Sequence, residues 1–96
     1  MISEVEIVDE SLVSRYQSLA QASIAQYRGR YLARGTGRVE VIEGELPSGQ
    51  RVIVVEFPTI MDKAREWYDS PEYAEALQVR EHALARRLTF VDGVGQ

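Results

Sequence analysis

Apolar and polar residues alternate near the start of the chain, and this pattern predicts a β-strand over residues 2–8. Successive side chains of a strand point to opposite faces of a sheet, so Val5 and Ile7 would lie on one face. Glu4 and Glu6 would then lie on the other face. The segment therefore predicts a strand with one face buried and one polar face.

A different spacing follows, in which apolar residues recur every three or four positions, and it predicts an amphipathic helix over residues 10–27. Asp9 is the expected N-cap, because its carboxylate can accept a hydrogen bond from the first turn. Gly29 is the expected C-cap, in the left-handed conformation that glycine tolerates. The apolar side of this helix consists of Val13, Tyr16, Ala20, Ile24 and Tyr27.

Three segments in the middle of the chain read as extended: residues 30–34, 39–43 and 51–57. The third is the strongest, because four consecutive β-branched residues favour burial on both faces of a central strand. A turn is predicted at Pro47-Ser48-Gly49, since proline, serine and glycine are typical turn residues.

The second helical region is predicted in two parts. Thr59 opens the first part with the spacing of a capping box, and Ser70-Pro71 breaks the region and starts a second helix. The apolar stripe of that second helix is Tyr73, Leu77 and Leu84, with Arg80 on the same stripe. A last strand is predicted over residues 87–91.

The resulting order, β-α-β-β-α-β, predicts an α+β, ferredoxin-like domain over residues 1–96, with a four-stranded antiparallel sheet and the second helix broken in two. Both helices would cover one face of the sheet. Apolar residues on the open face, such as Leu32, Val52 and Val54, need a cover. A second copy of the chain is the simplest cover, so we expect a homodimer that pairs as a dimeric α/β barrel.

Several motifs are similar to those of a known family. Residues 27–35 resemble a Y-G-G-R-Y-L-A-R-G block, and residues 56–59 resemble E-F-P-S. Residues 67–73 resemble W-Y-x-S-P-E-Y, with Arg80 seven positions further on. Together they resemble domain-of-unknown-function family 1330, in the dimeric α/β-barrel superfamily, over nearly the whole chain. In this sequence Arg28 stands where the family usually has glycine.

The resemblance implies the fold but no activity. Relatives in the superfamily include cofactor-free monooxygenases, haem-handling enzymes, isomerases and ligand-sensing regulatory domains. A shared fold does not determine a function, which must be argued from the site itself.

Composition excludes several classes of function. The formal net charge of −4 argues against a nucleic-acid binder, and the chain contains no cysteine. His82 is the only histidine and is expected at the surface, so we expect neither a metal site nor a cofactor. With neither a signal peptide nor a long apolar run, the protein is expected to be soluble and cytoplasmic, with no membrane contact.

The candidate site residues are charged or aromatic. Glu56 and Tyr68 are the candidate acid–base residues. Strand alternation places Arg34 on the open face with Glu56, where buried charges would either pair across a dimer or line a ligand cavity. The candidate ligand-binding residues are Arg34, Trp67, Tyr73 and Arg80.

Arg80 needs an acceptor because a guanidinium keeps its charge on burial. The alternatives are Glu56, a helix carbonyl and the carboxylate of a ligand, and Trp67 and Tyr73 could equally be core residues.

Two functions stay open. The first is a homodimeric small-molecule enzyme that works without metal, with its acid–base residues in a cleft at the sheet face. The second is a non-catalytic module for ligand binding or dimerisation. The ligand expected in either case is a small anionic or aromatic molecule.

Overall fold

A computed structural model describes residues 1–46 and 50–94 and confirms the α+β order β-α-β-β-α-β. The turn expected at Pro47-Ser48-Gly49 lies outside the described residues. The elements are β1 (Ile2–Ile7), α1 (Glu10–Gln26), β2 (Arg30–Arg34), β3 (Arg51–Glu56), a π-helical turn η1 (Ile60–Ala64), α2 (Arg65–Tyr68), α3 (Pro71–Ala83) and β4 (Leu84–Thr89).

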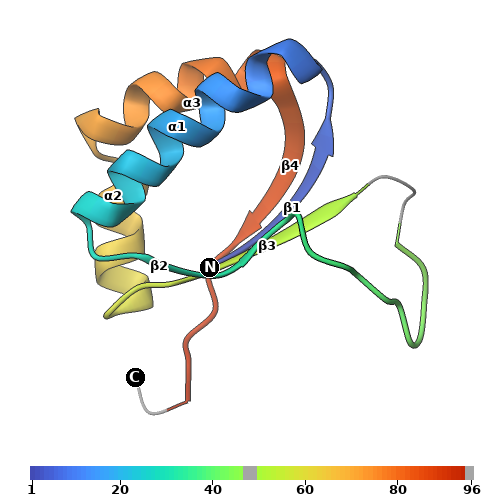
Figure 1. The fold of residues 1–96 in the computed structure, drawn as a ribbon. Coiled ribbons are helices and arrows are strands. Elements are labelled where there is room, and N and C mark those ends of the chain that lie inside the picture. Colours follow the sequence, from blue (N-terminus) through green and yellow to red (C-terminus); the bar gives the residue numbers. More distant parts are fainter. Residues whose placement is uncertain (47–49, 95–96) are drawn as a thin grey trace.

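The four strands form one antiparallel sheet in the order β2-β3-β1-β4. Helices α1 and α3 lie side by side over one face of this sheet, and the other face carries no helix (Figure 1). Both features agree with the ferredoxin-like prediction. The molecule therefore has two layers, and a ligand site can form between them or on the open face.

The core between the layers is aromatic. Trp67, Tyr73 and Phe57 are its largest fully buried side chains, and the Trp67 and Tyr73 ring centroids are 4.1 Å apart. Trp67 also donates a hydrogen bond from Nε1 to Ser23 Oγ on α1, at 2.9 Å. The expected burial of Trp67 is confirmed, and its polar atom is satisfied.

The two ends of α1 differ in how well the sequence predicts them. Asp9 is the N-cap as expected, because its Oδ1 accepts a hydrogen bond from the Ser11 N–H at 3.0 Å. The expected left-handed C-cap at Gly29 is wrong, since Arg28 takes that conformation with a φ of 64°. Gly29 has another role: a Cβ there would lie 2.5 Å from Ile24 Cγ2, so only glycine fits.

The second helical region is broken at Ser70-Pro71, as predicted, and the Ser70 hydroxyl accepts a hydrogen bond from the Tyr73 N–H. Its first part departs from the prediction. Thr59 is the N-cap residue, but its side chain makes no capping bond, and the chain enters a π-helical turn instead. The predicted capping box is therefore not formed.

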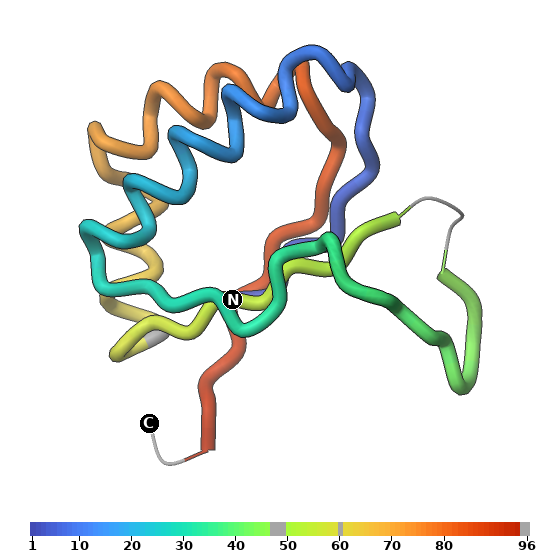
Figure 2. The backbone as a smooth tube through the Cα atoms, in the orientation of Figure 1, coloured from blue at the N-terminus to red at the C-terminus, as the bar shows by residue number. Residues whose placement is uncertain are grey.

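Two strand predictions need correction. Residues 39–43 form no strand, and they belong to a loop that leaves β2 and extends away from the two layers (Figure 2). The last strand is β4, over Leu84–Thr89, whereas residues 87–91 were predicted. Leu84 belongs to this strand and not to the helical stripe, and this shift decides which side chains face the helices.

Within residues 1–46 and 50–94, no helix is both long and apolar enough to cross a membrane. His82 is exposed, as expected.

Candidate functional site

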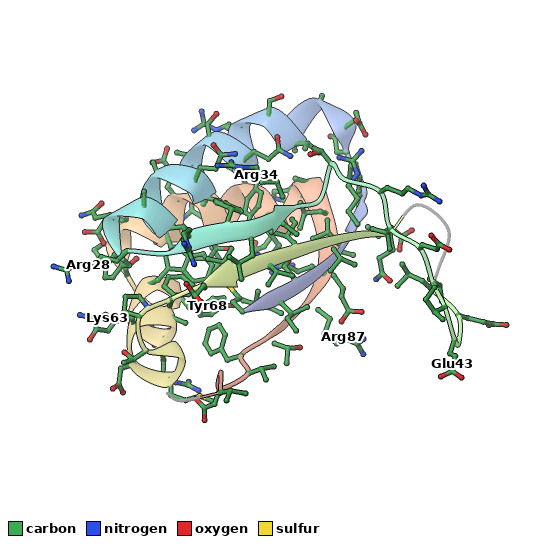
Figure 3. The ribbon with its side chains drawn as sticks, turned by 60° about the horizontal axis from the view of Figure 1, so that its bottom comes forward. Arg28, Arg34, Glu43, Lys63, Tyr68 and Arg87 are labelled. Carbon is green, nitrogen blue, oxygen red and sulfur yellow. The ribbon has the colours of Figure 1, made fainter. Side chains whose placement is uncertain are left out.

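A β-bulge in β2 carries Arg34 to the helix-covered face of the sheet. Tyr31 pairs with Val55 and Ala33 with Val54, so the register shifts by one residue between them. Such a bulge reverses the alternation of the residues that follow it. The prediction that Arg34 faces the open side is therefore wrong: Arg34 lies opposite Ile53 and extends towards α1, whereas Arg87 lies on the far side of the sheet (Figure 3).

Strand β4 brings in a second arginine, which sequence analysis missed. Because β4 starts at Leu84, its alternation puts Leu84, Arg86 and Leu88 on the same face, towards the helices. Arg86 is half-buried there, between the sheet and α3. Because the sequence analysis starts the last strand at residue 87, it assigns Arg86 to neither that strand nor the preceding helix.

Arg86 is held by two phenols. Its Nη1 donates to the Tyr16 hydroxyl at 2.7 Å, and its Nη2 donates to the Tyr73 hydroxyl at 2.6 Å. The two hydroxyls are 2.8 Å apart and share a third hydrogen bond. The three side chains come from α1, α3 and β4, so this cluster ties both helices to the sheet.

The surroundings of the cluster favour a charged Arg86 and a protonated Tyr73. Burial lowers the pKa of Arg86, but attraction to Tyr16 and Tyr73 raises it, and the pKa of Arg86 lies above its usual value. Burial is also the main reason why the pKa of Tyr73 is raised far above that of an ordinary tyrosine. At neutral pH, Arg86 is therefore a cation next to a protonated phenol.

Tyr16 and Arg86 of this cluster line a cavity between α1 and the sheet. The cavity has a volume of about 50 Å³, well below that of sites that enclose a whole small molecule, so only one end of a ligand has room inside it. Arg34 is exposed at the mouth, with its guanidinium carbon 4.5 Å from the centre of the Tyr31 ring. The remaining walls are mainly apolar or amide side chains, including Val5, Gln17, Ala20, Gln21, Ile24, Ile53 and Trp67.

The cavity is positively charged in an acidic protein. The whole chain has a formal net charge of −4, yet no Asp or Glu is found among the described residues that line this cavity. A second, connected hollow shares Arg34 with it, adds Arg51 and is likewise lined without an acid. Arginine without a carboxylate partner in a partly closed, apolar site is well suited to bind an anion.

The candidate acid–base residues lie elsewhere and apart from each other. Glu56 is on the open face, as predicted, and forms an exposed ion pair with Arg30 at 2.8 Å. Tyr68 is half-buried and lines a separate groove with Met61, Leu88 and other residues of that edge (Figure 3). The structure does not bring Glu56 and Tyr68 into one cleft.

The candidate ligand-binding residues divide between cavity and core. Arg34 and Trp67 line the cavity, with Trp67 at its floor. Tyr73 lies behind Tyr16 and is fully buried, so it reaches the cavity only through the Tyr16 hydroxyl. Arg80 is half-buried on α3, and its Nε has no hydrogen-bond partner among the described residues, so neither Glu56 nor a helix carbonyl, two of the three acceptors considered, is bonded at that atom.

In the part of the chain that the structure describes, no three potential metal-ligating side chains of His, Asp or Glu gather in one place.

Local signals for the missed residues were weak but present. Tyr16 was assigned to the apolar side of α1 for its ring, and its hydroxyl marks it as a residue that needs a polar partner when buried. Arg86 lies two positions from Leu84 and two from Leu88, so on a strand its side chain would share one face with these apolar residues.

The comparison with protein families agrees with the motifs quoted above. The profile of the family described as "Domain of unknown function (DUF1330)" matches residues 1–94, and the chain belongs to this family. Comparison with curated proteins gives no match.

Proposed function

We propose that this member of the DUF1330 family binds a small organic acid in the cavity between α1 and the sheet, with Arg34 and Arg86 as the groups that attract the carboxylate. One observation carries the proposal: the cavity contains arginine side chains but no carboxylate among its described lining residues. Arg86 itself donates to two phenol oxygens, and among the described residues it forms no ion pair with an acid.

A partly buried cation without a counter-ion is costly in free energy. Hydrogen bonds from phenols offset part of the lost hydration of Arg86, but they supply no opposite charge. A bound carboxylate would supply that charge and could accept the N–H groups that Arg86 does not direct at Tyr16 and Tyr73. Arg34 at the mouth would attract the anion and close over it.

The apolar walls define the rest of the ligand. Ala20, Ile24 and Ile53 offer aliphatic surface, so a short aliphatic body suits this lining better than a sugar or a nucleotide. A carboxylate at one end and an aliphatic body at the other match this lining.

Between the two functions left open by the sequence, the geometry gives more support to ligand binding. Acid–base catalysis by Glu56 and Tyr68 needs both groups at one substrate, and Glu56 is paired with Arg30 on the open face. A reaction in the cavity would have to use Tyr16 in their place, since this hydroxyl lies at the cavity wall.

The test compares an acid with its neutral analogue. We expect 4-methylpentanoate to shift the backbone NMR signals of Ala20, Ile24 and Ile53, and 4-methylpentanamide to bind about tenfold more weakly. Arg34→Met should weaken binding of the acid about fivefold or more, because it removes the charge and keeps the bulk.

Arg30→Met is the matched control, because Arg30 lies on the same strand but faces the other side, where it pairs with Glu56. It should leave the affinity unchanged. Equal binding of acid and amide, or equal effects of the two arginine substitutions, would contradict the proposal.

A further inference from the structure

The groove that contains Tyr68 is large enough for a whole small molecule, unlike the cavity beside α1. Its volume is about 460 Å³, within the range of small-molecule sites. The residues that line it come from η1, α2, the end of β4 and the residue after β4. They are Met61, Arg65, Tyr68, Leu88, Thr89 and Phe90. The groove therefore lies beside the outermost strand of the sheet, β4.

The apolar walls of the groove are supported from behind by the core. Tyr68, Leu88 and Phe90 are partly buried and pack against the core cluster. The Tyr68 ring centre lies 6.2 Å from that of Trp67 and 5.7 Å from that of Tyr73. An apolar ligand can therefore pack on these side chains without displacing them. Two of the three are aromatic rings, which favour a ring as their partner.

Arg65 adds a positive charge to this surface. Its guanidinium carbon lies 6.0 Å from the centre of the Phe90 ring, so a cation and an aromatic surface are neighbours. Arg65 takes part in none of the ion pairs within the described part of the chain. Asp62, Glu66 and Asp69 share a separate surface hollow with Arg65, but none of them lines the groove. On the groove side, Arg65 is therefore available to an anion.

The backbone that carries Met61 and Arg65 departs from a regular helix. Met61 lies in the π-helical turn η1, and Arg65 follows this turn directly as the first residue of α2. π-helical turns are rare and occur frequently at functional sites. This turn supplies both a thioether, which contacts aromatic rings favourably, and the cation of the groove. A binding site here gives the irregular turn a function.

We propose that this groove is a second binding site, for a small aromatic carboxylic acid. The ring of the ligand packs on Tyr68, Leu88 and Phe90, and its carboxylate binds Arg65. Because the Arg65 guanidinium is only 6.0 Å from the centre of the Phe90 ring, the ring and the carboxylate of the ligand must also be close together, as in 3-phenylpropanoate. The groove shares no described lining residue with the cavity beside α1, so the two sites are separate.

The first experiment compares three ligands on the wild-type protein, with the backbone NMR signals of Leu88 and Phe90 as the measurement. We expect 3-phenylpropanoate to shift these signals. The neutral 3-phenylpropanamide should bind about fivefold more weakly, because it cannot form an ion pair with Arg65. The acid 3-cyclohexylpropanoate keeps the charge but lacks the aromatic ring, and it should bind about twofold more weakly or worse.

The second experiment replaces the cation. Arg65→Met removes the charge and keeps much of the apolar stem, so it should weaken binding of 3-phenylpropanoate about fivefold. Lys63→Met is the matched control, because it also removes one positive charge, but Lys63 pairs with Glu66 and does not line the groove. This control should leave the affinity within about twofold. Equal losses in the two variants would reflect net charge alone and would overturn the role of Arg65.

Other results would also overturn the proposal. Equal binding of 3-phenylpropanoate and its amide would show that no cation recognises the ligand. Equal or tighter binding of 3-cyclohexylpropanoate would show that the site does not select a ring. Shifts at Ala20 and Ile24 in place of Leu88 and Phe90 would place the aromatic acid in the cavity beside α1, and no shifts at all would exclude the site. None of these results contradicts the function proposed for that cavity, which uses other residues and an aliphatic acid.

Discussion

Arg28 has a left-handed backbone at the junction between α1 and β2, with a φ of 64° and its side chain directed away from the two layers (Figure 3). This conformation brings the Cβ of an L-residue close to the backbone, whereas glycine adopts it freely. Arg28→Gly should therefore increase the free energy of unfolding, by about 0.5–1 kcal/mol after allowing for the greater freedom of the unfolded chain. Urea denaturation at constant m-value measures the change.

At Gly29, the next residue, we expect a substitution to destabilise the protein. An added Cβ would lie 2.5 Å from Ile24 Cγ2 and 3.0 Å from Phe57 Cε1, and both of these side chains are buried. Gly29→Ala should lower the free energy of unfolding by about 1–3 kcal/mol, because close-packed neighbours cannot move aside without strain. If the same denaturation series shows Gly29→Ala to be neutral and Arg28→Gly to be destabilising, the assignment of the two positions is reversed.

Trp67 offers a test of the core itself. It is fully buried against Phe57 and Tyr73 and donates a hydrogen bond to Ser23, so its removal leaves a large cavity and takes from the Ser23 hydroxyl one of its two hydrogen bonds. Trp67→Ala should reduce the free energy of unfolding by about 3–5 kcal/mol. A loss below about 1 kcal/mol in denaturant melts would mean that the ring does not occupy the core.

At the scale of elements, the sequence predicted correctly those features that depend on interactions between residues close together in the chain. Asp9 and Ser70 cap their helices as the sequence indicated, because each bonds to a backbone N–H within the next three residues. The order of strands and helices likewise followed from periodicity, which depends on near neighbours in the chain. Gly29 was misread because its requirement comes from Ile24 and Phe57, which no local pattern reveals.

The site was predicted less well because it depends on register. The bulge between Tyr31 and Ala33 is a feature of how β2 pairs with β3, so the sequence of β2 alone does not reveal it. It moves Arg34 from one face of the sheet to the other. A register shift of one residue moves every later side chain of the strand to the opposite face of the sheet. An error in the register therefore leads to an error in which residues are assigned to the site. The late start predicted for β4 had the same effect on Arg86.

The contribution of the contact between α1 and α3 to stability can be tested by varying the pH. Glu72, in the first turn of α3, accepts hydrogen bonds from Gln26 and Tyr27 at the end of α1. The pKa of Glu72 is lowered, first by the hydrogen bond to its own backbone N–H and then by the bond from Tyr27. A lowered pKa stabilises the folded state above the pKa of the unfolded chain, and this contribution is lost as the pH falls through the folded value.

We therefore expect Glu72→Gln to flatten the loss of stability between about pH 5 and pH 3, as thermal unfolding at each pH would show. Glu75→Gln is the control, because Glu75 lies on the same helix in an exposed pair with Arg15. Identical acid profiles for wild type and Glu72→Gln would show that this contact does not link the helices.

For the whole molecule, the open face of the sheet is the main unexplained surface. Leu32 is 56% exposed and Val91 51% exposed, and both line a hollow there with Val54 and Glu56 (Figure 1 shows this face without a helix). Charged pairs such as Glu4–Arg87 lie on the same face, at 2.8 Å. Apolar groups ringed by ion pairs are typical of surfaces that associate.

The homodimer expected from the sequence therefore remains a prediction, and the open face is its proposed interface. Sedimentation should give about twice the chain mass of 10.9 kDa at micromolar concentration. Leu32→Glu should shift the protein to monomer, because it places a charge on a face that would be buried between two facing sheets. Val8→Glu is the control, since Val8 is 68% exposed at the end of β1, outside that hollow. A stable wild-type monomer would leave the open face without a partner copy, but it would not affect the cavity between α1 and the sheet, because one chain forms this cavity alone.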